Sequence, residues 1–190
     1  MFVLKKKYFL FIENTKDIDL KNIKIRNKFS IIYRNPSKSE NKWNLLKFRK
    51  ICKLKGIKLY IANDLKLAIF LNANGIYLSA FNNSLKFLSF KNLKFDLIGS
   101  AHNIKEIRMK INQGCSSILL SKLYLVSYDR SASYLGIIKF NNYLKLYKRL
   151  IPLGGINIKN LNSLGKINCD GFALLSEIKK KPAKILNRLF

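Results

Sequence analysis

The sequence predicts a (β/α)8 barrel, the TIM-barrel architecture, built as one compact domain. The chain has 190 residues, the size of a single domain, and its apolar content of 48% is sufficient for a buried core. Eight short apolar runs without strict alternation, typical of parallel strands buried on both faces, alternate with segments of helical periodicity. A doubly wound open sheet gives the same local pattern. The barrel requires short loops and abbreviated helices, because about 250 residues is its usual length.

The elements follow in order along the chain. We expect strands at Phe9–Ile12, Phe29–Tyr33, Leu59–Ala62, Gly75–Leu78, Leu97–Ser100, Ser117–Ser121, Ile151–Leu153 and Phe172–Leu175. Apolar spacing of three and four residues predicts helices at Trp43–Lys55, Leu65–Leu71, Asn103–Asn112, Asn141–Leu150, Ile158–Leu164 and Ala183–Phe190. The link from 79 to 95 is the weakest, since it offers only a turn at 82–84 and a strand-like run at 87–90.

Two helix starts carry a polar cap. Asn103 follows a strand and precedes Glu106 by three positions, the spacing of a capping box with Asn in the Ser/Thr role. Asn157 likewise follows Gly154 and Gly155 and precedes a helical segment. Both points therefore predict a strand-to-helix junction.

The net charge of +27, from 37 Lys and Arg against 10 Asp and Glu, has two readings. It would attract nucleic acid or an anionic membrane. The lysines recur along the whole chain beside many Ile and Asn, which also fits a compositional bias that covers the solvated surface. Recognised nucleic-acid motifs are absent, so nucleic acid is a partner that we do not favour. No apolar run approaches the ~18 residues of a membrane helix, and we expect no membrane partner. The oligomeric state is not predicted.

Three cysteines, Cys52, Cys115 and Cys169, lie far apart without metal-ligand spacing. This spacing excludes a zinc ribbon and a secreted disulfide framework. We expect small buried hydrophobic side chains in a reducing cytoplasm.

In a parallel barrel, the residues directly after each strand form the working face. Acids in that position are Glu13, Asp64, Asp129 and Glu177, whereas Asp96 and Asp170 precede strands and are expected to be structural. His102 follows the fifth strand, where either a structural or a catalytic role is open.

The most specific pattern lies at the last two strands. Gly154 and Gly155 end the seventh strand before the Asn157 cap, and Ser176 follows the eighth. Glycines let backbone N–H groups approach an anion, and a helix N-terminus adds partial positive charge. Because barrel enzymes commonly bind phosphate here, the spacing predicts a phosphate cradle.

Six segments in this order resemble the family of thiamine-phosphate synthase and the TenI thiazole tautomerases. They are Ile32-Tyr33-Arg34-Asn35, Ile61-Ala62-Asn63-Asp64, Asn74-Gly75-Ile76-Tyr77-Leu78-Ser79, Ile98-Gly99-Ser100-Ala101-His102, Leu153-Gly154-Gly155-Ile156, and Cys169-Asp170-Gly171-Phe172-Ala173-Leu174-Leu175-Ser176. The resemblance covers residues 29–178. It implies a transferase of thiamine biosynthesis that joins hydroxymethylpyrimidine pyrophosphate to thiazole phosphate, with Mg²⁺ and basic groups drawing off pyrophosphate.

Site roles are implied residue by residue. The resemblance assigns the thiazole phosphate to Gly154, Gly155, Leu175 and Ser176, pyrophosphate to Arg34 and Asn63, Mg²⁺ to Asp64 and Asn82, and catalytic contacts to Ser100, His102 and Arg130. The pyrophosphate half departs from the family. Its Gln falls on Ile32, its first-loop Lys on Pro36, its second metal Asp on Asn82, and its Thr-Pro-Thr-Lys on residues 126–129, while the tautomerase His falls on Lys122.

Two rivals to the synthase stay open. One is a degenerate, TenI-like protein that binds thiazole phosphate without joining it to anything. The other is a basic RNA- or ribosome-binding protein, which would concentrate its lysines on one face.

Overall fold

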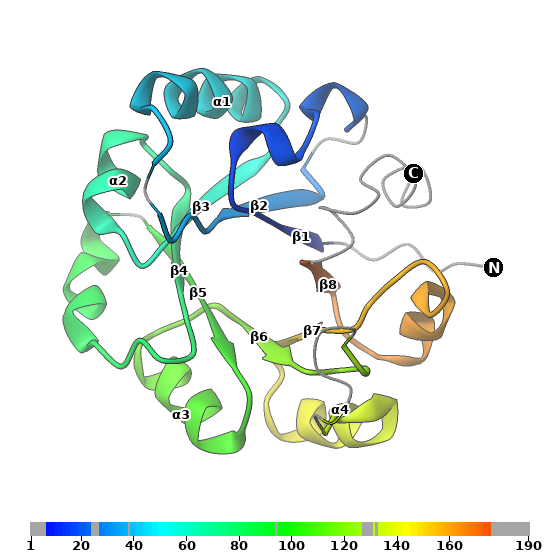
Figure 1. Cartoon of the computed structure of the whole chain (residues 1–190). Coiled ribbons are helices and arrows are strands. Elements are labelled where there is room, and N and C mark those ends of the chain that lie inside the picture. Colours follow the sequence, from blue (N-terminus) through cyan, green and yellow to red (C-terminus); the bar gives the residue numbers. More distant parts are fainter. Residues whose placement is uncertain are drawn as a thin grey trace.

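The computed structural model describes residues 7–23, 27–37, 39–93, 95–126, 131 and 133–175. Eight parallel strands pair in sequence order, and β1 also pairs with β8, so the sheet closes on itself. Figure 1 shows this ring with the helices outside it. The predicted (β/α)8 barrel is confirmed. The strands are β1 Lys7–Ile12, β2 Phe29–Tyr33, β3 Lys58–Ala62, β4 Gly75–Leu78, β5 Asp96–Ala101, β6 Ser117–Ser121, β7 Leu150–Leu153 and β8 Gly171–Leu174.

The first three predicted helices form where the periodicity places them. They are α1 Lys42–Leu54, α2 Leu65–Phe70 and α3 Ile104–Asn112. Asn103 caps α3 as predicted, since its side chain accepts a hydrogen bond from the Glu106 N–H at 3.0 Å. The Glu106 carboxylate reaches one residue further back than in a regular capping box, to the His102 N–H at 2.7 Å.

The predicted helix at 141–150 is shifted in the structure. The helix α4 spans Gly136–Leu146. Leu150 cannot belong to it, because it pairs with Ile118 in the sheet. The sheet therefore ends the helix earlier than the apolar spacing suggests.

Two other connections differ from the prediction. The run at 87–90 lies in a 3-10 segment, η3 Leu85–Leu93, and not in a strand. The reason is that β4 pairs directly with β5, which leaves no sheet edge for an added strand. The helix predicted at 158–164 is a turn followed by a six-residue 3-10 helix, η4 Leu161–Lys166. Two further 3-10 turns, η1 Thr15–Asp17 and η2 Leu20–Asn22, link β1 to β2. The helix predicted at 183–190 lies outside the described residues.

The core has two apolar layers. Alternation along β1 sends Phe9 and Phe11 into the barrel and Leu10 and Ile12 outward, against the surrounding helices. At the N-terminal end of the barrel, the Asp96 carboxylate accepts hydrogen bonds from the Tyr60 hydroxyl and the Ser116 hydroxyl. This is the structural role expected for an acid that precedes its strand.

The other sequence-level expectations concern cysteines and membrane helices. Cys52 and Cys115 are buried, and Cys169 is half-buried. Among the described residues, no helix has the length and apolar character needed to cross a bilayer.

Candidate functional site

The mouth of the barrel at the strand C-termini has a buried polar pair. The Tyr77 hydroxyl on β4 donates to the Ser100 hydroxyl on β5 at 2.7 Å. The Phe11 ring packs edge-on against Tyr77, with the centroids 5.2 Å apart. Because Ser100 accepts this bond, its own hydrogen remains available to donate to a ligand.

The charge of Arg34 acts on this pair. Burial raises the pKa of Tyr77, while the hydrogen bond to Ser100 and the positive charge of Arg34 oppose that rise. Tyr77 therefore stays a neutral donor at physiological pH. Arg34, predicted to contact pyrophosphate, is an exposed cation at the end of β2 whose field reaches the mouth.

His102, the predicted catalytic histidine, lies at the start of α3. Its Nδ1 atom is 3.0 Å from the Glu106 Oε2 atom, and its side chain is 44% exposed. Burial alone would raise the pKa of Glu106, but the bonds from the His102 N–H and ring and from Asn103 lower it. The geometry shows His102 engaged with its own helix cap, and its catalytic role stays a prediction.

The predicted phosphate cradle forms a tight turn at the end of β7. Gly154 and Gly155 have φ of 93° and 68°, the left-handed region that favours glycine. A Cβ on Gly155 would lie 2.5 Å from the carbonyl oxygens of Tyr124 and Leu125. The neighbouring β6 loop thus requires glycine here whatever the ligand.

Two asparagines hold this turn in place. The side-chain N–H groups of Asn157 and Asn160 donate to the Gly155 carbonyl at 3.2 and 2.8 Å. The Asn160 side-chain oxygen also accepts from the Asn157 N–H at 2.9 Å. The expected helix dipole is missing, because a turn follows instead of an α-helix. The left-handed turn forms without that helix, and its role as a phosphate cradle stays a prediction.

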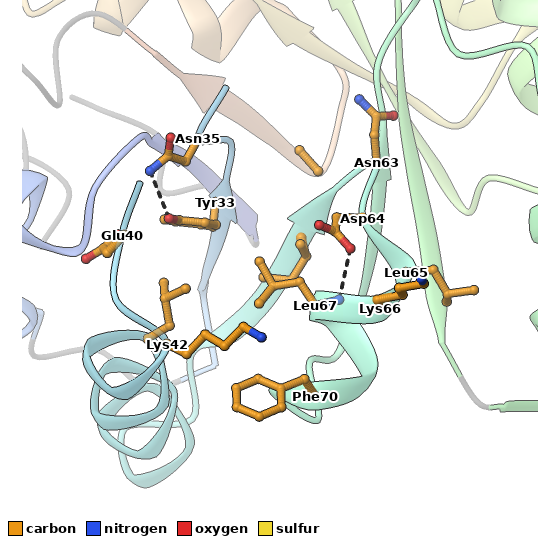
Figure 2. Close-up of a pocket in the computed structure, with 13 residues that line it drawn as sticks. Tyr33, Asn35, Glu40, Lys42, Asn63, Asp64, Leu65, Lys66, Leu67 and Phe70 are labelled. Atoms are coloured by element: carbon orange, nitrogen blue, oxygen red, sulfur yellow. Dashed lines mark hydrogen bonds between the residues drawn. The ribbon is translucent and has the colours of Figure 1, made fainter. Parts of the chain in front are cut away.

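Asp64 and Asn82, the residues predicted to hold magnesium, make hydrogen bonds to different parts of the site. The Asp64 carboxylate caps α2 by accepting from the Leu67 N–H at 2.9 Å. Asp64 lines a cavity of about 590 Å³ together with residues of α1, α2 and the ends of β2 and β3. Figure 2 shows the side chains around this cavity. The side chain of Asn82 is bonded to Asn63, because its N–H donates to the Asn63 side-chain oxygen at 2.9 Å.

This donor set does not fit a shared magnesium site. Magnesium binds one or two carboxylates plus phosphate oxygens. Asn82 presents an N–H group to Asn63, and its own side-chain oxygen accepts from the Ser84 N–H at 3.0 Å. Among the described side chains, no three of His, Cys, Asp and Glu gather as a metal site.

Arg130 and Ser176 lie outside the described residues. Leu175 is half-buried at the end of β8 and packs against the apolar layer inside the barrel.

The sequence reasoning did not single out Tyr77 or assign Asn160 a role. Tyr77 lies two residues after Gly75 on β4, so the every-second-residue alternation of a barrel strand would have placed its ring inside. Asn160 carried no such signal, because its bonds depend on the turn conformation at 154–160.

Residues 6–178 match the family model "Thiamine monophosphate synthase". A thiamine-phosphate synthase of Geobacillus thermodenitrificans is 23% identical over 138 residues, 70% of this chain and 62% of that protein. The enzyme of that name from Persephonella marina is 26% identical over 155 residues, 79% of this chain and 74% of that protein. The matched region thus spans under two thirds of the Geobacillus relative.

Solved structures show the same fold. Thiamine phosphate pyrophosphorylase from Pyrococcus furiosus superposes with a TM-score of 0.72 at 14% identity, covering 98% of both chains. A 3-keto-L-gulonate-6-phosphate decarboxylase from Vibrio cholerae gives 0.61 at 11% identity, over 98% of this chain and 99% of that one. With a family model that matches nearly its whole length, this chain belongs to the thiamine monophosphate synthase family.

Proposed function

We propose that this protein joins hydroxymethylpyrimidine diphosphate to the thiazole phosphate in thiamine biosynthesis and releases diphosphate. The observation that carries the proposal is the left-handed turn at Gly154 and Gly155, fixed by Asn157 and Asn160. It lies at the same end of the barrel as Tyr77 and Ser100. A phosphorylated substrate held at the turn would extend toward that pair.

The cradle would hold the ester phosphate of the thiazole. Glycines without Cβ atoms let the phosphate oxygens approach backbone N–H groups, which donate to anions. Leu175 and Ser176 at the end of β8 would complete the cradle, as the resemblance implies. This role needs no charged side chain, and it fits the absence of any acid from the 154–160 loop.

The reaction itself breaks one bond and forms another. The C–O bond between the pyrimidine methylene and diphosphate breaks, and the thiazole nitrogen supplies the electron pair for the new C–N bond. Such a step needs positioned reactants, little water, and positive charge near the leaving group. Phe11, Tyr77 and Ser100 would give an enclosed floor, and Arg34 would give the cation. His102 and Arg130 stay predicted contacts for the pyrimidine diphosphate.

Magnesium is general in the family, but no step is assigned to it in this chain. Asp64 supplies a carboxylate at the rim, while the side-chain amide of Asn82 is bonded to Asn63. The alternative function, binding of thiazole phosphate without coupling, is favoured by the same replacement of an acid by Asn82. No described feature favours the RNA-binding alternative, since exposed lysines lie on all four α-helices, at Lys47, Lys66, Lys105 and Lys139 for example.

Product formation tests the proposal. Purified protein is incubated with both phosphorylated substrates, and thiamine phosphate is measured by chromatography. We expect product in proportion to protein, and less of it with Arg34→Gln. If thiazole phosphate binds but no product forms, the binding-only alternative replaces the synthase.

A further inference from the structure

The ends of β3 and β4 are joined by side-chain amides. Asn63, in the left-handed conformation with φ of 54°, directs its oxygen to two donors. These are the Ser79 N–H at 3.1 Å and the Asn82 side-chain N–H at 2.9 Å. The Asn82 side-chain oxygen in turn accepts from the Ser84 N–H at 3.0 Å. We call the Asn63–Asn82 contact the amide bridge.

A buried lysine supports the bridge from the outer side of the barrel. Lys110 on α3 is 0% exposed, and its Nζ atom donates to the Asn82 carbonyl at 2.6 Å and to the Gln113 side-chain oxygen at 2.8 Å. Gln113 donates from its Nε2 atom to the carbonyls of Asn82 and Ser84 at 2.8 and 2.9 Å. Three hydrogen bonds therefore join Lys110 and Gln113 to the loop that carries Asn82. A fourth joins the two side chains to each other.

The burial of Lys110 depends on Gly99. A Cβ on Gly99 would lie 2.7 Å from the Lys110 Cδ atom, so only glycine on β5 leaves room for the lysine stem. Burial lowers the pKa of Lys110, while Cys115 and Glu106 oppose the shift. Among the described residues Lys110 forms no ion pair, and uncharged oxygens accept its bonds. A lysine buried at this cost is expected to have a structural task.

That task is to fix the strand ends. In the family that this chain resembles, two acids and a magnesium ion connect the positions that follow β3 and β4. Here the second position is Asn82, whose N–H group would repel a cation at the place where it faces Asn63. We propose that the amide bridge, supported by Lys110, closes this rim in place of a divalent cation. The inference deepens the proposed function, on which its meaning for catalysis rests.

Metal binding tests the inference without any turnover. Mn²⁺, used as a spectroscopic probe for Mg²⁺, is titrated into the protein and free ion is followed by electron paramagnetic resonance. We expect no binding by the wild type up to millimolar Mn²⁺. The double variant Asn63→Asp, Asn82→Asp replaces both amides of the bridge by carboxylates beside Asp64, and we expect it to bind Mn²⁺ at least about tenfold more tightly than the wild type. Wild-type binding that Asn82→Ala abolishes, or a double variant that gains nothing, would overturn the proposal.

Amide hydrogen exchange tests the role of Lys110. The N–H groups of Ser79 and Ser84 donate into the bridge, so their exchange reports on it directly. We expect Lys110→Met to speed exchange of both by about tenfold or more. Lys105→Met, an exposed lysine on the same helix, is expected to change neither. Should Lys110→Met fail to fold, Gln113→Glu removes the donors to Asn82 and Ser84 and carries the same expectation. Unchanged exchange in the folded variant would contradict the supporting role.

A last comparison separates this inference from the proposed function. Product formation is measured in chelator and in added magnesium. Equal product in both supports the metal-independent rim. Product only with magnesium keeps the synthase, and it overturns the inference when the wild type also binds Mn²⁺ and Asn82→Ala abolishes that binding. Mn²⁺ results as expected with no product in either buffer keep the inference and overturn the synthase.

Discussion

The two sides of the barrel mouth differ in the part of the chain that forms them, backbone on one side and side chains on the other. After β7, the site consists of backbone: two left-handed glycines, of which Gly154 lies against Ser121 and Lys122 and Gly155 against the carbonyls of Tyr124 and Leu125. Between β3 and β4, it consists of side chains that are bonded to one another, and Asn82 is the residue that the sequence resemblance aligns with a metal-binding acid of the family. A backbone site is protected by its packing, because any Cβ there meets neighbouring atoms. A side-chain site can change chemistry through single substitutions while the strands keep their places.

The largest expected effect comes from breaking the backbone side. Gly155→Ala puts a Cβ against two carbonyl oxygens and forces alanine into the left-handed region. We therefore expect the free energy of unfolding to fall by about 2 to 4 kcal/mol. Gly136→Ala is the matched control, since Gly136 has φ of 69° but an added Cβ there would have no neighbour within 4 Å. It is expected to cost about 1 to 2 kcal/mol. Denaturant unfolding measures both, and equal losses would show that packing does not protect the turn.

A smaller effect is expected from removing the support of the turn. Asn160→Ala removes the shorter of the two side-chain hydrogen bonds to the Gly155 carbonyl. We expect thiazole phosphate to bind about tenfold more weakly and the free energy of unfolding to fall by about 1 kcal/mol. Asn141→Ala serves as the control, because Asn141 donates to Lys166 away from the turn. Calorimetric titration decides the outcome. If both variants bind like wild type, the asparagines serve the fold and not the ligand.

The next comparison concerns the buried pair of Tyr77 and Ser100 in the barrel mouth. Tyr77→Phe removes the hydroxyl bonded to Ser100, and we expect kcat/KM to fall by about three- to tenfold because the mouth loses an oriented donor. Tyr60→Phe removes a hydroxyl bonded to Asp96 at the other end of the barrel. It is expected to lower stability without changing kcat/KM. Equal kinetic effects would place Tyr77 outside the site.

The smallest expected effect is a pH dependence of stability that comes from Glu106 on α3. Hydrogen bonds from His102 and Asn103 lower the pKa of Glu106 in the folded protein. The stability contributed by this carboxylate is therefore present above its ordinary pKa and is lost as the pH falls through the lower folded value. We expect Glu106→Gln to lose less stability than wild type between about pH 5 and pH 3. Parallel losses in urea unfolding would contradict this.

The sequence predicts the barrel well because buried parallel strands have a distinctive composition. All eight strands lie where the apolar runs place them, and Gly154 and Gly155 follow β7 in a left-handed turn, while their predicted role in binding phosphate stays a prediction. The helix at 141–150 could not be bounded, because Leu150 is taken by the sheet. Lys110 and Asn82 could not be connected from the sequence, since a lysine at a helical position predicts a solvated surface. The structure shows that this one is buried, with Gly99 leaving room for its stem.

The most direct test of the backbone cradle is a comparison of two ligands that differ only in the phosphate. Thiazole phosphate and its unphosphorylated alcohol are titrated calorimetrically into the wild-type protein. Hydrogen bonds to a charged ester predict that the phosphate binds at least about tenfold more tightly than the alcohol. Equal affinities would mean that the glycine turn grips no anion, and the account of this site would be wrong.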